Sequence, residues 1–207
     1  MRHRGFSLME VLITMGIFAL VTTLLVGLIT MSGNWIRRTN AHQDSQQDLL
    51  VAAGQIARTA AQAPADSVLL QYPSGAPATG DLILSFQTAR DAAGTYFEDP
   101  NTFEPLYQGY TVFYLDGGSR RVLQAFLPAP PSTTIAPAAP AAVLGVLNPA
   151  ADKAVAHQVD SFMALDPSDD SPTDVVTNPL RFRLQVGQAK RDQMVSLEAV
   201  RSVRLYR

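Results

Sequence analysis

A single acidic residue, Glu10, stands at the head of a long uncharged segment that runs from Val11 to Met31. A carboxylate among so many apolar side chains is poorly solvated, and it attracts any cation at the same depth strongly. The same residue would lie in the first turn of a helix, where the helix macrodipole favours a negative charge. Glu10 is therefore the first candidate functional residue, with an ordinary first-turn acid as the alternative interpretation.

Other residue types that carry chemistry are few and badly spaced. The chain has three histidines, at positions 3, 42 and 157, and no cysteine. No histidine pair has metal-ligand spacing, no Gly-rich loop follows a strand, and no nucleophile elbow is present. The pattern excludes disulfides and thiolate chemistry, and it predicts a protein that is not an enzyme. A dense His, Ser or Asp site in the fold would revive the alternative of a membrane-tethered hydrolase.

Four aspartates gather in one polar loop: Asp166, Asp169, Asp170 and Asp174. Carboxylate oxygens are good Ca²⁺ ligands, so these residues are the weak candidates for a metal site. The loop lacks the alternating spacing and the glycine of an EF-hand, which favours a solvated loop instead. We expect no cofactor, with Ca²⁺ as the one alternative.

The uncharged segment 11–31 is long enough to cross a bilayer. Its 21 residues give roughly 32 Å of helix, close to the roughly 30 Å hydrocarbon core of a membrane. Lipid offers no partners for free backbone groups, so a single span must be helical. Ala19, Thr23 and Gly27 recur every four residues and put small side chains on one face, where a second helix can approach closely. Such residues are also ordinary in spanning helices, which is the competing interpretation.

Composition limits the rest of the chain. The 207 residues carry a net charge of −2, and 16 % of them are charged. Clustered lysine and arginine are missing, so no nucleic-acid contact is expected. About 170 residues lie outside the span, enough for one modest globular domain.

The pattern beyond the membrane predicts an α+β fold, in which a long helix over 6–63 packs on an antiparallel β-sheet domain over 64–207. Leu49, Ala53, Ile56 and Ala60 form one helical stripe, and Pro64 ends the helix. Short apolar runs bounded by turn residues predict strands at 67–72, 81–88, 109–115 and 120–127, with a hairpin turn at 116–119.

The later part of the domain alternates between loops and strands. Alanine and proline dominate residues 128–151, which predicts an exposed insertion in which 143–147 docks as a short edge strand. One strand is expected over 153–165. Period-two alternation predicts two closing antiparallel strands, at 180–186 and 195–205. Their arginines, Arg181, Arg183, Arg201 and Arg204, are expected to point outward, as a solvated face or as a partner-facing strip.

The N-terminal residues resemble those of a known family. Gly5 followed by Phe6, with Glu10 four residues later and a long apolar helix beyond, is similar to the prepilin signal of type IV pilins and type II secretion pseudopilins. The resemblance implies a leader over residues 1–5 that prepilin peptidase removes between Gly5 and Phe6. It also implies N-methylation of Phe6 and a role for Glu10 in assembly with other pilins or pseudopilins through the N-terminal helix.

The resemblance also implies a setting. The protein would be a single-pass subunit of the bacterial inner (cytoplasmic) membrane, with its C-terminal domain extracytoplasmic, that joins a filament for pilus assembly, protein secretion or competence. Size, helix and late strands look more like a minor pilin or pseudopilin, of the W-type or J-type, than a major subunit. Arg2 and Arg4 fit the short leader of this family. The positive-inside rule alone does not decide the orientation, because Arg37 and Arg38 lie on the other side of the apolar segment.

Two other targeting interpretations compete. A cleaved secretory signal would have a shorter apolar region and a small-residue cleavage site after it. An uncleaved single-pass anchor that carries an extracytoplasmic binding module is the better rival. The N-terminus of the membrane form distinguishes these possibilities.

Overall fold

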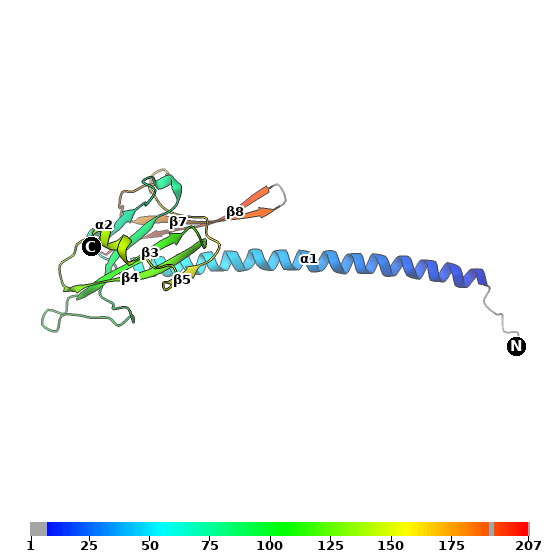
Figure 1. Ribbon diagram of the computed structural model, residues 1–207, viewed down its shortest axis with the longest axis horizontal. Helices are drawn as coiled ribbons and strands as arrows, with labels where there is room; N and C mark the ends of the chain where they lie inside the picture. The colour runs from blue at the N-terminus through cyan, green and yellow to red at the C-terminus, as the bar shows by residue number, and fades with distance from the viewer. Residues whose placement is uncertain (1–7, 191–192, 207) are drawn as a thin grey trace. The chain divides into compact units, whose positions relative to one another are not determined.

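The computed structural model describes residues 8–190 and 193–206. The architecture is α+β, with a long N-terminal apolar helix followed by an antiparallel β domain (Figure 1). The chain divides into two compact units, Met1–Asp44 and Ser45–Arg207. The first unit consists of helix over its described residues, and the second holds the end of that helix and all the strands.

Helix α1 covers Leu8–Ala60, against the predicted range 6–63, of which residues 6 and 7 lie outside the described residues. Its end comes at Ala60 because the chain tightens before Pro64. The amides of Gln62 and Ala63 bond to carbonyls three residues earlier, at 3.2 and 3.0 Å, as in the tighter turns that often finish a helix. Proline disfavours helical geometry in the residue before it, so the helix cannot continue to residue 63.

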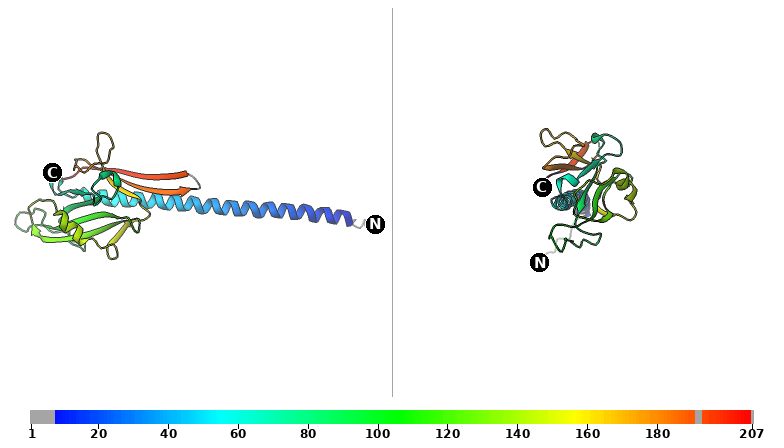
Figure 2. Two further views of the ribbon diagram at one scale, coloured as in Figure 1. Left: turned by 45° about the horizontal axis from the view of Figure 1, so that its top comes forward. Right: turned by 90° about the vertical axis from the view of Figure 1, so that its left-hand side faces the viewer.

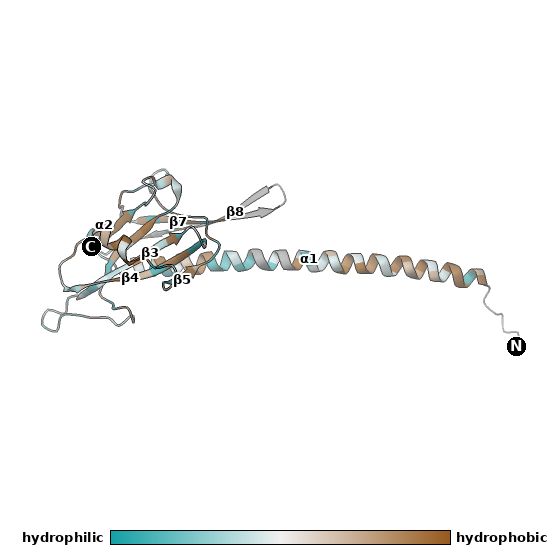
Figure 3. Ribbon diagram, in the orientation of Figure 1, coloured by the Kyte–Doolittle hydropathy of each residue, from teal (hydrophilic) through white to brown (hydrophobic). Residues whose placement is uncertain are grey.

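The first part of α1 is the candidate membrane span. Leu8–Ile36, 29 residues, is long and apolar enough to cross a bilayer, and none of it is buried within the structure. Figure 3 shows hydrophobic residues recurring along this part of the helix. Side chains such as Leu12, Phe18 and Leu28 are more than 60 % exposed, as expected of a helix whose solvent is lipid.

A five-stranded sheet forms one layer of the second unit. Its order is β1-β2-β3-β4-β5, and every neighbouring pair is antiparallel. The strands are β1 (Leu69–Gln71), β2 (Ile83–Thr88), β3 (Tyr107–Asp116), β4 (Arg121–Ser132) and β5 (Lys153–Ala156). Short 3₁₀ helices, η1 (Ala65–Ser67) and η2 (Pro77–Thr79), flank β1. The predicted hairpin is confirmed, with Asp116 opposite Arg121 across the turn.

A second, three-stranded antiparallel sheet has the order β6-β7-β8. Its strands are β6 (Ser161–Leu165), β7 (Leu180–Lys190) and β8 (Gln193–Val203). The two closing strands were predicted, whereas the single strand over 153–165 is wrong. That segment forms β5 and β6, which belong to different sheets, because Gln158 takes a left-handed conformation (φ 59°) between them.

The two sheets meet at Gly80. The Gly80 carbonyl accepts a hydrogen bond from the Phe162 amide at 2.6 Å, and the Leu82 amide donates to the Phe162 carbonyl at 3.0 Å. A Cβ at Gly80 would lie 2.4 Å from the Ser161 Cβ, and the residue has φ +73°. Both facts require glycine, because a side chain would be strained and would push the sheets apart.

The core lies between α1 and the sheets, and the views in Figure 2 show the end of α1 beside both of them. Ala53, Ile56 and Ala60 of the predicted stripe are completely buried, and so is Ala52, which was not predicted, while Leu50 is 52 % exposed. Alanines at these positions let the helix backbone approach the sheets closely. Aromatic pairs fill the centre: Phe86 with Phe113, and Phe162 with Phe182, each with ring centroids 6.1 Å apart.

Most residues of the predicted insertion 128–151 are exposed, as expected, but the predicted start of the insertion is wrong. β4 continues to Ser132 through Pro128, Pro130 and Pro131. Prolines are tolerated there because β5 pairs only with residues 122–124 of β4, which leaves the later part of β4 as a sheet edge whose outward amides need no partner.

The expected edge strand at 143–147 is also wrong, because the segment forms helix α2 (Pro140–Val146). Pro140 occupies the first turn, where its missing N–H costs nothing. Val143 is completely buried in a second hydrophobic cluster with Ile83, Val112 and Leu123. The insertion therefore covers the outer face of the five-stranded sheet.

Candidate functional site

The residues predicted to carry processing and assembly fall at the start of α1. Gly5 and Phe6 lie outside the described residues. Glu10 lies in the first turn of α1 and is exposed. The Thr14 hydroxyl donates to the Glu10 carbonyl at 2.8 Å and also lies 2.9 Å from the Val11 carbonyl. Glu10 therefore lies in the first turn of a regular helix, near the N-terminal end of the candidate span. A negative charge is favourable in the first turn of a helix because of the helix dipole.

Ala19, Thr23 and Gly27 lie four residues apart in α1, as predicted. The Thr23 hydroxyl donates to the Ala19 carbonyl at 2.8 Å, so it turns back along its own helix. A Cβ placed at Gly27 would meet no atom within 4 Å. Ala19, Thr23 and Gly27 are exposed in the single chain. Their side chains are small, so the backbone of a second helix could approach this face closely.

The threonines of the span show a feature that the sequence analysis missed. Thr14, Thr22, Thr23 and Thr30 all donate their hydroxyls to the carbonyl four residues earlier, at 2.7 to 3.0 Å. Each hydroxyl therefore has a partner within the helix, which removes most of the cost of placing it in lipid. The sequence could have predicted these hydrogen bonds, because the hydroxyl of a threonine in a helix can bond to the carbonyl four residues earlier.

The aspartates of the 166–174 loop do not come together as a ligand set. Asp170 forms an ion pair with Arg181, and Asp166 accepts a hydrogen bond from the Ser168 amide at 2.8 Å. Asp169 accepts from the Ser171 amide at 2.9 Å, and hydrogen bonds from Ser171 lower the pKa of Asp169. Nowhere in residues 8–190 and 193–206 do three His, Cys, Asp or Glu side chains form a group that could hold a metal ion.

The buried polar groups of the domain act as structural ties. The Tyr72 hydroxyl accepts from the Ala164 amide at 2.9 Å and donates to the Thr173 carbonyl at 3.0 Å, so it joins the end of β1 to β6. Burial raises the pKa of Tyr72 to about 12. Its two hydrogen bonds to backbone groups of separate segments make Tyr72 a structural contact of the domain.

Two further ties hold the 128–151 region. The Gln87 side chain donates to the Thr134 carbonyl and accepts from the Ala136 amide, each at 3.1 Å, in the way a neighbouring strand would. Tyr114 donates to the Asp152 carboxylate at 2.6 Å, which also accepts from the Asn148 amide at 2.8 Å. Burial and the Asp152 hydrogen bond raise the pKa of Tyr114. These long-range contacts have no signature in the local sequence pattern.

A shallow groove lies where α1 gives way to the strands. It is lined by Pro64, Val68, Ile135, Val176 and Tyr206, with Asp66 and Asn178 among its few polar residues. The Asn178 amide is occupied, since its oxygen accepts from the Leu205 amide at 3.1 Å. Thr177 also lines the groove, and its hydroxyl donates to the Pro179 carbonyl at 2.9 Å.

Comparison with known families gives one finding. Residues 1–26 match the family model described as the prokaryotic N-terminal methylation motif. Comparisons with curated proteins and with solved structures give no match. The matched residues include Glu10 and run into the part of α1 that contains Ala19 and Thr23.

Proposed function

We propose that this chain, which carries the prokaryotic N-terminal methylation motif and the α+β architecture of a type IV pilin-like protein, is the precursor of a filament subunit. Prepilin peptidase cuts it between Gly5 and Phe6, and the new N-terminus at Phe6 is methylated. The observation that carries the proposal is the motif at residues 1–26, which leads directly into an unburied apolar helix long enough to span a membrane.

The mature subunit is anchored in the bacterial inner membrane by α1, with the β domain extracytoplasmic. It assembles with other pilins or pseudopilins as a minor subunit, in pilus assembly, protein secretion or DNA uptake. The W-type minor pilins and J-type pseudopilins are the subtypes proposed. The motif indicates a structural subunit, in which the chemistry is performed on the chain by other proteins.

Glu10 supplies the specificity of assembly. After cleavage, Phe6 carries an α-amino cation at about the depth of the Glu10 carboxylate. An ion pair in a poorly solvated place is strong, and a missing partner there is costly. A Glu10 carboxylate that meets the Phe6 amine of a neighbouring subunit would fix the axial register of the filament.

N-terminal mass spectrometry of the membrane form tests the processing step. In cells that contain prepilin peptidase we expect a chain that begins with methylated Phe6, and in matched cells without the peptidase a chain that begins at Met1. An unprocessed Met1 terminus in both strains would overturn the proposal. That outcome would support the uncleaved single-pass anchor with an extracytoplasmic binding module.

The assembly step is tested separately. Glu10→Ala and the near-isosteric Glu10→Gln should both yield processed, membrane-inserted protein that no longer enters filaments, because both remove the charge. Asp48→Asn, an exposed acid of α1 beyond the candidate span, is the matched control and should assemble normally. Normal co-assembly of Glu10→Ala would contradict this role.

A further inference from the structure

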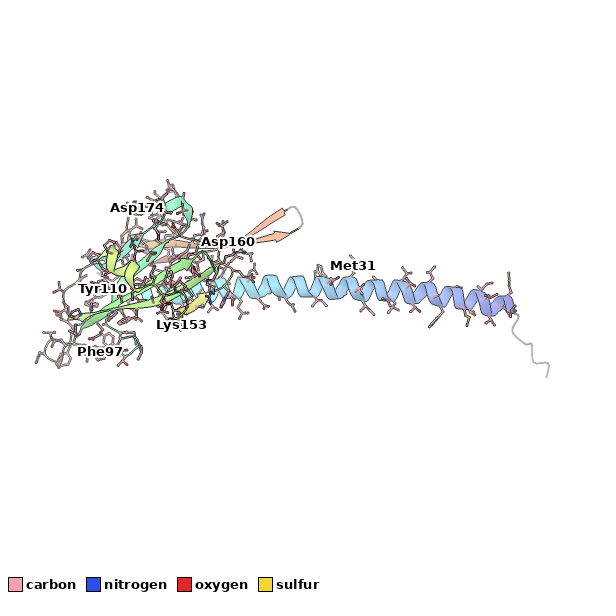
Figure 4. The ribbon with its side chains drawn as sticks, in the orientation of Figure 1. Met31, Phe97, Tyr110, Lys153, Asp160 and Asp174 are labelled. Carbon is pink, nitrogen blue, oxygen red and sulfur yellow. The ribbon has the colours of Figure 1, made fainter. Side chains whose placement is uncertain are left out.

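The loop between β2 and β3 exposes three aromatic side chains. Phe103 is 74 % exposed, Tyr96 49 % and Phe97 36 %, and all belong to residues 89–106. Figure 4 shows Phe97 at the edge of the domain. Several exposed aromatic side chains within one loop are typical of interaction surfaces, where they act as anchors. We call residues 89–106 the aromatic loop.

The aromatic loop is held in shape by its own contacts. The Asp91 carboxylate accepts from the Ala93 and Thr95 amides, each at 2.9 Å. Arg90 donates to the Gly94 carbonyl at 2.8 Å and lies over the Tyr96 ring, 5.8 Å from its centroid. Because the loop is already ordered, little conformational entropy is lost when it binds a partner.

The aromatic loop is also acidic. It contains Asp91, Glu98, Asp99 and Glu104 against the single basic residue Arg90, whose guanidinium is engaged within the loop. Within the described part of the chain, none of these four carboxylates forms an ion pair. A partner that covers the aromatic side chains must therefore bring positive charge, because unpaired carboxylates lose solvation in an interface.

The complementary charge is present in the same chain. Residues 64–179 contain thirteen acidic residues and four basic ones, a net charge of −9, whereas residues 180–207 contain seven basic and two acidic residues, a net charge of +5. β8 is the edge strand of its sheet, and the exposed Arg201 and Arg204 form no ion pair with another described residue. We call Arg201, Arg204 and the open edge of β8 the β8 surface.

The two surfaces lie on different sides of the domain. In Figure 1 the β7–β8 sheet is at the upper side of the β domain and the β2–β3 loop is at its lower side, and the end-on view of Figure 2 shows the same separation. An aromatic loop therefore meets a β8 surface most readily on another molecule. Such a head-to-tail contact uses different surfaces of the two copies, and it can repeat along an open array.

We propose that the aromatic loop of one copy docks against the β8 surface of a second copy of this chain. Phe103 and its aromatic neighbours supply the buried anchors, while Glu98 and Glu104 meet Arg201 and Arg204. The contact rests on the proposed function in one respect, since a shared membrane brings the copies together in one orientation. It adds a lateral contact between β domains to the assembly role of the helix.

Charge reversal on each surface tests this docking. The full chain is solubilised in detergent, and self-association is measured by analytical ultracentrifugation at low and high salt. The double variants Glu98→Lys/Glu104→Lys and Arg201→Glu/Arg204→Glu should each associate about tenfold more weakly than the unmodified chain, because like charges then oppose each other. A mixture of the two variants should recover association, since reversed loops then face reversed β8 surfaces.

Matched controls separate the contact from general effects. Asp174→Lys reverses an exposed carboxylate outside both surfaces, and Leu144→Ala trims a 45 % exposed apolar side chain of α2. Both should leave association unchanged, whereas Phe103→Ala should weaken it. The tyrosine near-ultraviolet signal of each variant reports whether the domain is folded, because all six tyrosines lie between residues 72 and 206.

Three outcomes would overturn the inference: no self-association of the unmodified chain, association that ignores both reversals, or a mixture that fails to recover. The same measurements in the Glu10→Ala background distinguish this failure from failure of the proposed function. Association that disappears with Glu10→Ala but ignores the charge reversals would refute the docking and leave the helix-based assembly intact.

Discussion

Replacing Ile56 by alanine should destabilise the β domain strongly, although Ile56 belongs to the helix that carries the candidate membrane span. Ile56 is completely buried in the main core cluster, which also holds Leu84, Phe113 and Phe182. Buried Ile→Ala changes cost about 2–5 kcal/mol, the transfer free energy of the lost methyl and methylene groups plus a cavity term. A domain of this size has a free energy of unfolding of about 5–15 kcal/mol, so the loss is a large part of the total.

The neighbouring Leu50→Ala is the matched control. It removes a similar volume from the same helix, but Leu50 is 52 % exposed and leaves no internal cavity, so we expect a cost below about 1 kcal/mol. Urea unfolding of the full chain in detergent micelles provides the assay. All six tyrosines lie in the second unit, whereas the single tryptophan, Trp35, lies in the first. Tyrosine near-ultraviolet dichroism therefore follows the domain, and Trp35 fluorescence follows the other unit.

The two signals should respond differently. Ile56→Ala should lower the midpoint of the tyrosine transition and leave the Trp35 signal unchanged. Equal costs for Ile56→Ala and Leu50→Ala, or a cost of Ile56→Ala below about 1 kcal/mol, would refute the placement of α1 residues 49–60 in the domain core.

Other substitutions and additions test single residues of the domain and of the helix. Tyr72→Phe should lower the free energy of unfolding by about 1–3 kcal/mol, because the Ala164 amide and the Thr173 carbonyl lose their partner. The raised pKa of Tyr72 means that its contribution is complete below pH 10 and is lost as the pH rises from 10 towards 12. Urea titrations should show a steeper decline in the unmodified chain than in Tyr72→Phe, where the raised pKa of Tyr114 still acts. Gly27→Leu should insert into the membrane normally but enter filaments poorly, as measured by fractionation and filament recovery, and equal loss of both would contradict a packing role. Adding Ca²⁺ or a chelator should leave the melting temperature of the full chain unchanged, since Asp170 pairs with Arg181 and Asp169 with Ser171; a clear rise with Ca²⁺ would show a metal site in the 166–174 loop.

Local patterns predicted the elements whose physics is local. The uncharged run predicted the apolar helix that is the candidate span, the spacing of Ile56 and Ala60 predicted the buried face of the helix, and the turn at 116–119 predicted the β3–β4 hairpin. Each of these depends on periodicity or on turn chemistry within a short window. The processing residues Gly5 and Phe6 lie outside the described residues, so their role stays a prediction of the motif.

The errors came where distant residues decide the outcome. The prolines of 128–132 disfavour a strand because proline has no amide to donate to a neighbouring strand. No donor is needed here, because β5 pairs only with residues 122–124 of β4, and the sequence does not show where β5 ends. The segment 143–147 has no strong local preference, and burial of Val143 against Ile83 and Leu123 decides that it is helical. The strand over 153–165 divides because each half finds a different sheet.

The expected outward strip of arginines shows the same limit within one strand. Arg181 and Arg183 lie on the outer face of β7, where Asp170 and Glu198 are their partners. Arg201 is paired in register with the buried Phe182, so it belongs to the inner face, yet it is exposed. A charge on the inner face of an edge strand opposes indiscriminate pairing with other strands. The sequence could predict that Arg201 lies on the same face of β8 as Ala199 and Val203, because residues two apart in a strand share a face. It could not predict that Arg201 would stay exposed on that face.

Helix α1 serves two environments, and its sequence changes accordingly. From Leu8 to Ile36 apolar side chains surround the helix and are exposed, as lipid contact requires. From Leu49 to Ala60 apolar side chains occupy one stripe and are buried in the β domain. The continuous helix makes the residues of the candidate span and the residues that hold the domain parts of one element, an arrangement that is consistent with the proposed assembly through the N-terminal helix.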